Sequence, residues 1–380
     1  MNRILVVLPN WFGETLFVTP FLRVLRQQRP DAYLATLGWP TCRAILLHNP
    51  HVDEFLDYDE RGAHRGLAGS WRLIQALRAH RVDAAFILRR SFSRTLLLAL
   101  AGIPTRVGFA NAKSGWLLTH RVRPSPMPRH PAMGGDAVVR VGGMSPHAGR
   151  GVPGATGMPV GLHKAFSYLP LLEAVGLSVV RHTYEYTVSP EERRAVQELW
   201  PSTRDENGRP LIVLHPGANW SHKRWAADRF AALGDRLISA HQARVLITGG
   251  PDDVALAESI QRAMRQPAVL VAGQTTVRQL GALLEQVQLV VSNDTGILHL
   301  AAALRRPLVA LYGPTSPTLT GPLGDPQRTA VLHHADCCPR IPCYQPHHPA
   351  HPGMDAISVD EAYAAACQML NAECRIRNDQ

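Results

Sequence analysis

The sequence predicts an α/β protein built from two Rossmann-like domains. Its 380 residues exceed what one ordinary hydrophobic core holds, so two domains are expected. Both halves alternate short apolar runs with amphipathic stretches, a pattern typical of parallel sheets with helices on both faces. A polar stretch at 202–209 separates the two halves and predicts a linker.

The first half contains five predicted strands and four predicted helices. Apolar runs indicate strands at 4–8, 33–37, 54–58, 84–88 and 106–108. Helical periodicity indicates helices at 15–28, 41–48, 70–80 and 91–101. The second half repeats this scheme, with strands at 211–214, 244–248, 269–271, 289–292 and 308–311, and helices at 226–240, 252–265, 277–286 and 296–304.

These elements define the expected domain boundaries. We predict an N-terminal domain at 1–188 with a Gly- and Pro-rich insertion at about 124–161, which is a loop or lid, or a tolerated insertion. A linker at 189–209, including a helix at 190–199, leads to a second domain at 210–357. The final helix, within 358–380, is expected to return toward the N-terminal domain.

Composition excludes several classes of protein. The net charge of +10 suits an anionic partner, but no zinc finger, lysine-rich arm or RNA-binding strand motif is present, so we expect no nucleic acid. No apolar run approaches the ~20 residues of a membrane span. Glu14 interrupts the apolar N-terminus, so we interpret 4–8 as a strand rather than part of a signal peptide. Six sparse cysteines favour a reducing compartment, and we expect a cytoplasmic protein.

The stretch from Ser292 to Ala303 is the most informative in the chain. An apolar run ends in Asn-Asp-Thr-Gly and a helix former follows, which predicts a strand, a tight turn and a helix N-terminus. Asp294 or Thr295 can cap this helix, and Gly296 lets a ligand approach the backbone. His299 lies one turn later on the same face as Thr295. Such a helix end attracts phosphate, although an ordinary capped helix gives the same pattern.

Three further turns follow predicted strands of the second half. One runs from His215 through Gly217 to Lys223, and its backbone N–H groups and ammonium suit an anion. Another contains Gly249 and Gly250, which permit close approach of a nucleotide. The third is the turn at 313–317. Each alone also fits an exposed loop, and neither dinucleotide-binding nor P-loop spacing is present. Their convergence on one sheet edge indicates a ligand site.

The loop after the first strand contains Asn10, Gly13 and Glu14. A partly desolvated Glu14 can act as a general base. Equally, an acid in the first turn complements the helix dipole without any catalytic role. A late cluster of cysteines and histidines fits no standard zinc spacing, so we predict no metal site. The cluster comprises Cys337, Cys338, Cys343, His347, His348 and His351.

Taken together, these motifs resemble glycosyltransferase family 9, the ADP-heptose:lipopolysaccharide heptosyltransferases, and most closely the heptosyltransferase II branch. The resemblance covers most of the chain outside the insertion. It is carried by the segments Ile4-Leu5-Val6-Val7, Phe12-Gly13-Glu14-Thr15, His215-Pro216-Gly217-Ala218, Lys223-Arg224-Trp225, Thr248-Gly249-Gly250-Pro251 and Ser292-Asn293-Asp294-Thr295-Gly296 with His299.

The resemblance implies a GT-B fold, in which two Rossmann-like domains with parallel sheets face each other across a cleft. It implies inverting, metal-independent transfer of heptose from ADP-heptose, bound by the C-terminal domain, to a lipopolysaccharide core precursor at the inner-membrane face, bound by the N-terminal domain. No cofactor is implied. Lys223 would contact the donor diphosphate, Asp294 the sugar hydroxyls, and Thr295 and Gly296 the phosphate. The family's base is an aspartate at the position of Glu14.

Other functions are compatible with the same residues. A related transferase would use another nucleotide sugar or a protein acceptor. A catalytically silent nucleotide-sugar binding protein is a further alternative, suggested by the change from aspartate to Glu14. A nicotinamide-dependent dehydrogenase is disfavoured because its glycine fingerprint is missing.

Overall fold

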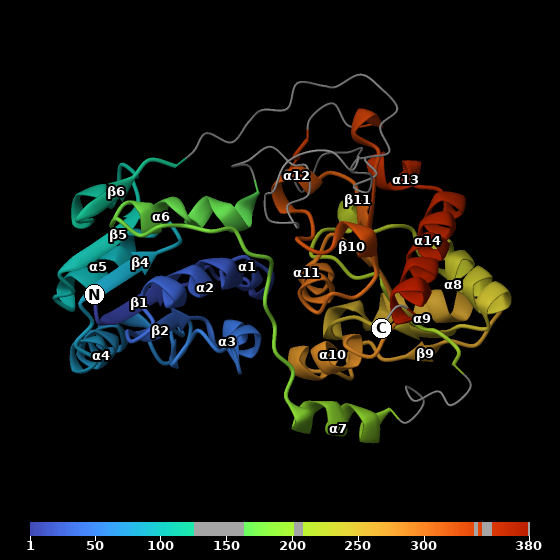
Figure 1. Ribbon diagram of the computed structural model, residues 1–380, viewed down its shortest axis with the longest axis horizontal. Coiled ribbons are helices and arrows are strands. Elements are labelled where there is room, and N and C mark those ends of the chain that lie inside the picture. The colour runs from blue at the N-terminus through green and yellow to red at the C-terminus, as the bar shows by residue number, and fades with distance from the viewer. Residues whose placement is uncertain (125–162, 201–207, 338–340, 344–351, 379–380) are drawn as a thin grey trace. The chain divides into compact units, whose positions relative to one another are not determined.

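The computed structural model describes residues 1–124, 163–200, 208–337, 341–343 and 352–378. Over these residues the chain forms two compact units, each built on a six-stranded sheet (Figure 1). The first unit comprises the described residues up to 124 together with those from 163 to Thr187. The second begins at Val188. The insertion predicted at about 124–161 falls outside the described residues, apart from Pro124.

The first sheet is entirely parallel, and its strand order is β3-β2-β1-β4-β5-β6. This is the order of the doubly wound dinucleotide-binding fold. Its strands are β1 (Arg3–Val7), β2 (Tyr33–Gly38), β3 (Glu54–Asp57), β4 (Ala84–Ile87), β5 (Thr105–Phe109) and β6 (His120–Val122).

Helices cover both faces of the first sheet. Leu5 and Val7 of β1 share a core with residues of α4 and α5, whereas Phe86 packs edge-on against Phe21 of α2 on the other face. Both strand faces are therefore apolar, which explains the continuous hydrophobic run in β1. The helices are α1 (Phe12–Leu16), α2 (Thr19–Gln28), α3 (Pro40–Leu46), α4 (Gly66–Ala79), α5 (Phe92–Leu100), α6 (Pro170–Glu173) and the 3₁₀ turns η1 (Gly115–Leu117) and η2 (Lys164–Tyr168).

The single helix predicted at 15–28 is in fact two helices, α1 and α2. Pro20 lies in the first turn of α2, where its missing N–H and fixed φ are tolerated. Deeper inside a continuous helix it would clash with the carbonyl four residues earlier. That carbonyl, from Leu16, instead accepts a hydrogen bond from the Thr19 hydroxyl at 2.8 Å. Because of this break, α1 ends at Leu16, two residues after Glu14.

The second sheet repeats the topology of the first. Its strand order is β12-β11-β10-β7-β8-β9. With β7 to β12 renumbered from one to six, this is the order of the first sheet read from the opposite edge. The strands are β7 (Leu211–His215), β8 (Arg244–Ile247), β9 (Val269–Leu270), β10 (Leu289–Asn293), β11 (Leu308–Tyr312) and β12 (Thr329–His333). The edge strands β6 and β12 were not predicted, because β6 has only three residues and the apolar run of β12 is limited to its three central residues.

The helices of the second unit lie close to their predicted positions, apart from two four-residue helices, α12 and α13, which were not predicted. They are α7 (Pro190–Leu199), α8 (Ala227–His241), α9 (Val254–Ala263), α10 (Val277–Leu284), α11 (Gly296–Ala303), α12 (Pro317–Thr320), α13 (Gly353–Ala356) and α14 (Val359–Asn378), with 3₁₀ turns η4 (Ser221–Lys223), η5 (Pro251–Asp253), η6 (Pro326–Arg328) and η7 (Ala335–Cys337). The predicted linker contains α7, which is held to α10 by a 2.5 Å ion pair between Glu192 and Arg278.

The final helix, α14, packs within the second unit. Ala362, Ala366 and Met369 belong to the same buried core as Ile212 and Leu214 of β7. The sequence predicted that this helix returns toward the N-terminal domain. In the structure, the buried apolar side chains of α14 pack on β10, β11 and β12 and belong to the core of the second unit.

None of the helices in the described ranges is both long enough and apolar enough to cross a membrane. The functionally important feature of the fold is where the strand order reverses. This happens between β1 and β4 in the first sheet and between β7 and β10 in the second. In doubly wound sheets, ligands bind beyond the carboxyl ends of the strands at these points.

Candidate functional sites, one in each unit

Asp294 is the centre of the site in the second unit. It follows β10 directly, and its side chain is almost fully buried, with 6% of the residue exposed. Its Oδ2 accepts a 2.7 Å hydrogen bond from the Thr315 hydroxyl and lies 2.7 Å from the Lys223 ammonium. The Nε2 atom of His299 lies 3.9 Å from Oδ1. The structure therefore brings Lys223, from the turn after β7, to Asp294 and His299 of the segment that joins β10 to α11.

The charge of Asp294 is set by two opposing effects. Burial raises the pKa of this carboxyl group, but the neighbouring Lys223 ammonium and the hydrogen bond from Thr315 lower it, and the net effect is a lowered pKa. Asp294 is therefore ionised at neutral pH. A buried carboxylate paired with an ammonium is a polar centre that can exchange its internal partners for the hydroxyls and phosphates of a ligand.

The start of α11 offers backbone donors next to this carboxylate. Thr295 occupies the N-cap position with an extended backbone, but its side chain makes no capping hydrogen bond. Its hydroxyl lies 3.4 Å from the Ser292 hydroxyl instead. The carboxylate of Asp294 is engaged by Lys223 and Thr315. The expected side-chain cap is thus not formed by Thr295, and the first-turn N–H groups from Gly296 onward suit an anion.

At two positions of the site, close packing against Asp253 leaves no room for a side chain larger than that of glycine. A Cβ atom added to Gly217 would lie 2.3 Å from Asp253 Oδ2, and one added to Gly249 would lie 2.7 Å from Asp253 Cβ. At Gly250 the nearest atom would be 3.7 Å away, an ordinary contact. Asp253 in turn accepts a 3.1 Å hydrogen bond from the Gly250 N–H. It thereby connects the turns after β7 and β8.

Asn293 connects the β7 turn to β10. Its side-chain amide donates to the Pro216 carbonyl at 2.8 Å and accepts from the Trp225 N–H at 3.2 Å. Both ends of the loop that carries Lys223 are therefore fixed to the end of β10. His215, the last residue of β7, bonds through Nδ1 to the Thr248 hydroxyl at 3.0 Å. Burial lowers the pKa of His215 to about 4, so its imidazole is neutral.

In the first unit, Glu14 lies in the first turn of α1 and forms an ion pair with Lys164. Lys164 is distant in sequence and begins η2, and its ammonium also lies 6.0 Å from the Phe17 ring centroid. Both side chains remain accessible, with 28% of Glu14 and 39% of Lys164 exposed. Gly13 precedes the carboxylate within α1. This is the position expected for an acid that complements the helix dipole, with the addition of a specific cation.

A buried arginine fixes the loop that leads from β1 to Glu14. Arg94, from α5, is only 3% exposed. Its guanidinium donates to the Leu8 carbonyl at 2.8 Å and to Asn10 Oδ1 at 2.5 Å. Asn10 is itself buried, so this residue supports the loop rather than offering its side chain to solvent. Sequence analysis predicted Asn10 for this loop but not Arg94, whose charge gave no indication of burial.

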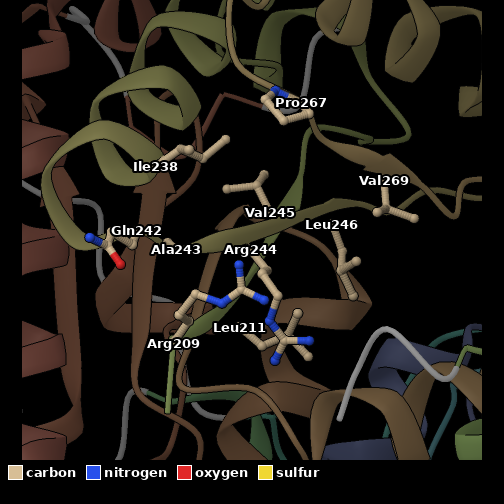
Figure 2. Close-up of a pocket in the computed structure, with 10 residues that line it drawn as sticks. All are labelled: Arg209, Leu211, Ile238, Gln242, Ala243, Arg244, Val245, Leu246, Pro267 and Val269. Carbon is tan, nitrogen blue, oxygen red and sulfur yellow. The ribbon is translucent and has the colours of Figure 1, made fainter. Parts of the chain in front are cut away.

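A cavity of about 500 Å³ in the second unit lies at the other edge of the sheet from Asp294 (Figure 2). It is lined by the first residues of β7, β8 and β9, namely Leu211, Arg244 and Val269, and by the end of α8. Figure 2 also shows Arg209 beside Arg244. Because it faces the amino ends of the strands, this cavity is separate from the candidate site.

Of the late Cys/His cluster, Cys338, His347, His348 and His351 lie outside the described residues. Cys343 is buried, and its N–H donates to the Pro314 carbonyl at 2.8 Å, next to the turn that carries Thr315. In the described part of the chain no three histidine, cysteine or acidic side chains are grouped as metal ligands.

Comparison with known proteins places the chain in a family. The model of glycosyltransferase family 9 (heptosyltransferase) matches residues 161–348. The lipooligosaccharide heptosyltransferase 2 of Haemophilus ducreyi is 30% identical over 335 residues, which cover 84% of this chain and 86% of that protein. The lipopolysaccharide heptosyltransferase 2 of Salmonella typhimurium is 29% identical over 341 residues, covering 87% and 88% respectively.

Solved structures show the same architecture. The ADP-heptose lps heptosyltransferase II of E. coli superposes with a TM-score of 0.72 at 24% identity, covering 98% of this chain and 99% of that one. A family 9 glycosyl transferase from Veillonella parvula superposes with a TM-score of 0.79 at 22% identity, covering 97% of each. The fold is therefore GT-B, and with the sequence relatives it defines the protein as a glycosyltransferase. The chain belongs to glycosyltransferase family 9.

Proposed function

We propose that this protein is an inverting, metal-independent transferase that moves heptose from ADP-heptose to an inner-core acceptor of lipopolysaccharide. The observation that carries the proposal is the buried pair of Lys223 and Asp294 beside the start of α11. It joins a cation and backbone donors, which suit a diphosphate, to a carboxylate, which suits sugar hydroxyls. The relatives named heptosyltransferase 2 support heptose as the transferred sugar.

The second unit is proposed to bind the donor. Lys223 and the N–H groups at Thr295 and Gly296 would bind the diphosphate and stabilise the charge that develops as it leaves. Asp294 would accept hydrogen bonds from the sugar, with His299 beside it. The glycines at 217, 249 and 250 would let the nucleotide approach the backbone. The E. coli relative is an ADP-heptose enzyme, which supports ADP as the nucleotide.

The first unit is proposed to bind the acceptor, with Glu14 as general base. The Glu14 carboxylate would accept the proton of an acceptor hydroxyl while the hydroxyl oxygen attacks the anomeric carbon. The bond from that carbon to the diphosphate oxygen would break, and its electron pair would leave with ADP. Attack opposite the leaving group inverts the anomeric centre. Lys164 would orient the carboxylate before the proton moves.

Lys164 also favours one alternative function. An ammonium that stays paired with Glu14 competes with an acceptor hydroxyl for the carboxylate oxygens, as expected for a nucleotide-sugar binding protein without transferase activity. A transferase for another nucleotide sugar or for a protein acceptor would use the same groups. We place the reaction in the cytoplasm, at the inner-membrane face where a lipopolysaccharide precursor would be presented.

Mass spectrometry of the product from purified protein, ADP-heptose and a truncated core acceptor tests the proposal. The expected result is an acceptor that has gained one heptose, with release of ADP. A general base contributes typically 10²–10⁴-fold, so Glu14→Gln should lower kcat by roughly 100-fold or more. Its binding of ADP should not change, because the proposed donor residues lie in the second unit.

Glu173→Gln is the matched control, since Glu173 is an exposed glutamate of α6 in the same unit. It should retain the kcat of the parent protein. Full transfer activity in Glu14→Gln would remove Glu14 from the role of base. Calorimetric binding of ADP-heptose without any product over long incubation would favour the silent binding protein.

A further inference from the structure

The ion pair between Lys164 and Glu14 is held by few other contacts. Within the part of the chain that the structure describes, Lys164 is the one cation paired with Glu14, and Glu14 is the one acid paired with Lys164. The ammonium also lies 6.0 Å from the Phe17 ring centroid, which is the outer limit of a cation–π attraction. The pair can therefore open when a single long side chain rotates.

A second ion pair of the same unit is equally exposed but more firmly held. Arg23 lies 2.7 Å from Glu185, and the side chains are 37% and 23% exposed, close to the 39% and 28% of Lys164 and Glu14. Glu185 also lies 2.8 Å from Nε2 of His51. Glu185 thus keeps a partner when Arg23 moves away, whereas Glu14 depends on Lys164 alone.

The charge of the incoming group decides whether the Lys164 pair opens. A neutral hydroxyl offers no counter-charge to the ammonium, so it has to compete with Lys164 for the oxygens of Glu14. A phosphate or a carboxylate can replace Glu14 as the partner of Lys164 through charge-assisted hydrogen bonds. Lysine suits such an exchange, because its ammonium is a point charge on a flexible four-carbon stem. Both side chains are accessible, so an anion can reach the ammonium from solvent.

We propose that Lys164 makes sugar transfer depend on an anionic group of the acceptor, close to the hydroxyl that reacts. This group draws the ammonium away from Glu14, and the released carboxylate then accepts the proton of the hydroxyl. Lys164 makes and breaks no covalent bond, so the balance of the transfer step is unchanged. Its role is in specificity, favouring acceptors with a phosphate or carboxylate over neutral sugars. The inference rests on the proposed function of Glu14 as the base.

The first test follows Lys164 without relying on transfer. Lysine occurs at positions 113, 164 and 223 of the sequence and nowhere else, so NMR of the full-length protein labelled with ¹³Cε-lysine can resolve each side chain. Lys164→Met assigns the signal of interest by its loss. Glu14→Gln removes the counter-charge and should shift the Lys164 signal without any added compound.

The probe is a truncated core saccharide with its phosphates and carboxylates intact, compared with the same saccharide after phosphatase treatment and carboxyl methylation. The intact form should shift the Lys164 signal, and the neutral form at the same concentration should not. The signal of Lys223, in the second unit, is the internal control and should not move. Saccharides that have received only one of the two treatments identify whether the phosphate or the carboxylate is responsible.

The second test measures transfer to the same two saccharides. On the neutral form, Lys164→Met should raise kcat by up to about fivefold, because a partly exposed ion pair favours its closed form by no more than roughly this factor. On the intact form, it should lower kcat/KM roughly tenfold or more, because a hydrogen bond between charged groups is lost. A merely structural role would lower both. Lys164→Arg should be slower than the parent on the neutral form, since a planar fork grips a carboxylate with two hydrogen bonds.

Arg23→Met is the matched control, because it breaks an equally exposed ion pair of the same unit that has no place in the proposed site. The preference of this variant for the intact over the neutral saccharide should stay within about twofold of the parent. Its ¹³Cε signal from Lys164 should respond to the intact saccharide as in the parent.

Two results would overturn the inference. One is a Lys164 signal that responds to both saccharides equally or to neither, and the other is an equal change of preference in Lys164→Met and Arg23→Met. Transfer without a selective Lys164 response refutes this inference alone. A selective Lys164 response without any transfer refutes the proposed function and leaves Lys164 as an anion-sensitive partner of Glu14.

Discussion

Replacing Asp294 by asparagine tests the energetics of the site in the second unit. The change keeps the volume of the side chain and removes its charge, so the Lys223 ammonium loses its partner. Breaking a buried ion pair from one side costs about 3–5 kcal/mol. The Lys223 side chain remains 17% exposed, and water there offsets part of this loss. We therefore expect the free energy of unfolding to fall by roughly 2–4 kcal/mol.

The effect should be non-additive. Lys223→Met combined with Asp294→Asn removes both charges, and the double variant should recover at least about 1 kcal/mol relative to the sum of the single changes. Urea titration read by hydrogen exchange of peptides from β10 and α11 reports the second unit separately from the first. This separation is needed because a two-unit chain does not have to unfold in one step.

Asp360→Asn provides the matched control. Asp360 pairs with Arg236 at 2.5 Å in the same unit, but 87% of the Asp360 side chain is exposed. Exposed pairs contribute little, so this variant should stay within about 0.5 kcal/mol of the parent. Equal losses from Asp294→Asn and Asp360→Asn would refute the argument that burial makes the Lys223 pair important.

Two further predictions concern the same unit. Gly217→Ala should weaken the binding of ADP, measured by calorimetry, by roughly tenfold or more, because the added Cβ would displace the Asp253 carboxylate. Gly250→Ala is the control: its Cβ would lie 3.7 Å from the nearest atom, so ADP affinity should stay within about threefold of the parent. Equal effects of the two changes would contradict the packing argument. The pKa of His215 is about 4 in the folded protein, against an ordinary value of 6.5 in the unfolded chain. Between pH 6.5 and pH 4 the unfolded chain therefore binds a proton that the folded protein does not, so the free energy of unfolding falls as the pH falls. His215→Gln should reduce this loss by up to roughly 3 kcal/mol, measured by urea titrations at pH 7 and pH 4; an unchanged pH dependence would show that His215 is not responsible.

Much of the fold could be predicted because buried parallel strands leave continuous apolar runs. The segments containing β1, β7 and β10 were identified in this way, and with them the turns that carry Glu14, Lys223 and Asp294. The strand-to-helix order at Asp294 predicted a helix N-terminus there, and the structure has α11 in that place. Local pattern was sufficient because each of these turns is positioned by the strand directly before it.

Contacts between distant segments could not be predicted in this way. Lys164 follows Glu14 by 150 residues and forms no motif with it. Arg94 resembles any helix arginine until its burial under Leu8 and Asn10 is seen. Asp253 and Thr315 were passed over because an acid in a first turn and a hydroxyl in a turn are common everywhere. Packing alone shows that they fix Gly217 and Asp294.

The internal pairing of Asp294 has a consequence for which molecules stay bound. Lys223 and Thr315 already neutralise and solvate this carboxylate, so an incoming compound competes with partners the protein supplies itself. In the proposed binding mode, a bare nucleotide would attract Lys223 away but would lack the hydroxyls of the transferred sugar that would replace it at Asp294. An intact sugar nucleotide would replace both partners. Once the sugar had been passed on, the remaining nucleotide would compete with a restored lysine–aspartate contact, and this competition would favour its release after each turnover.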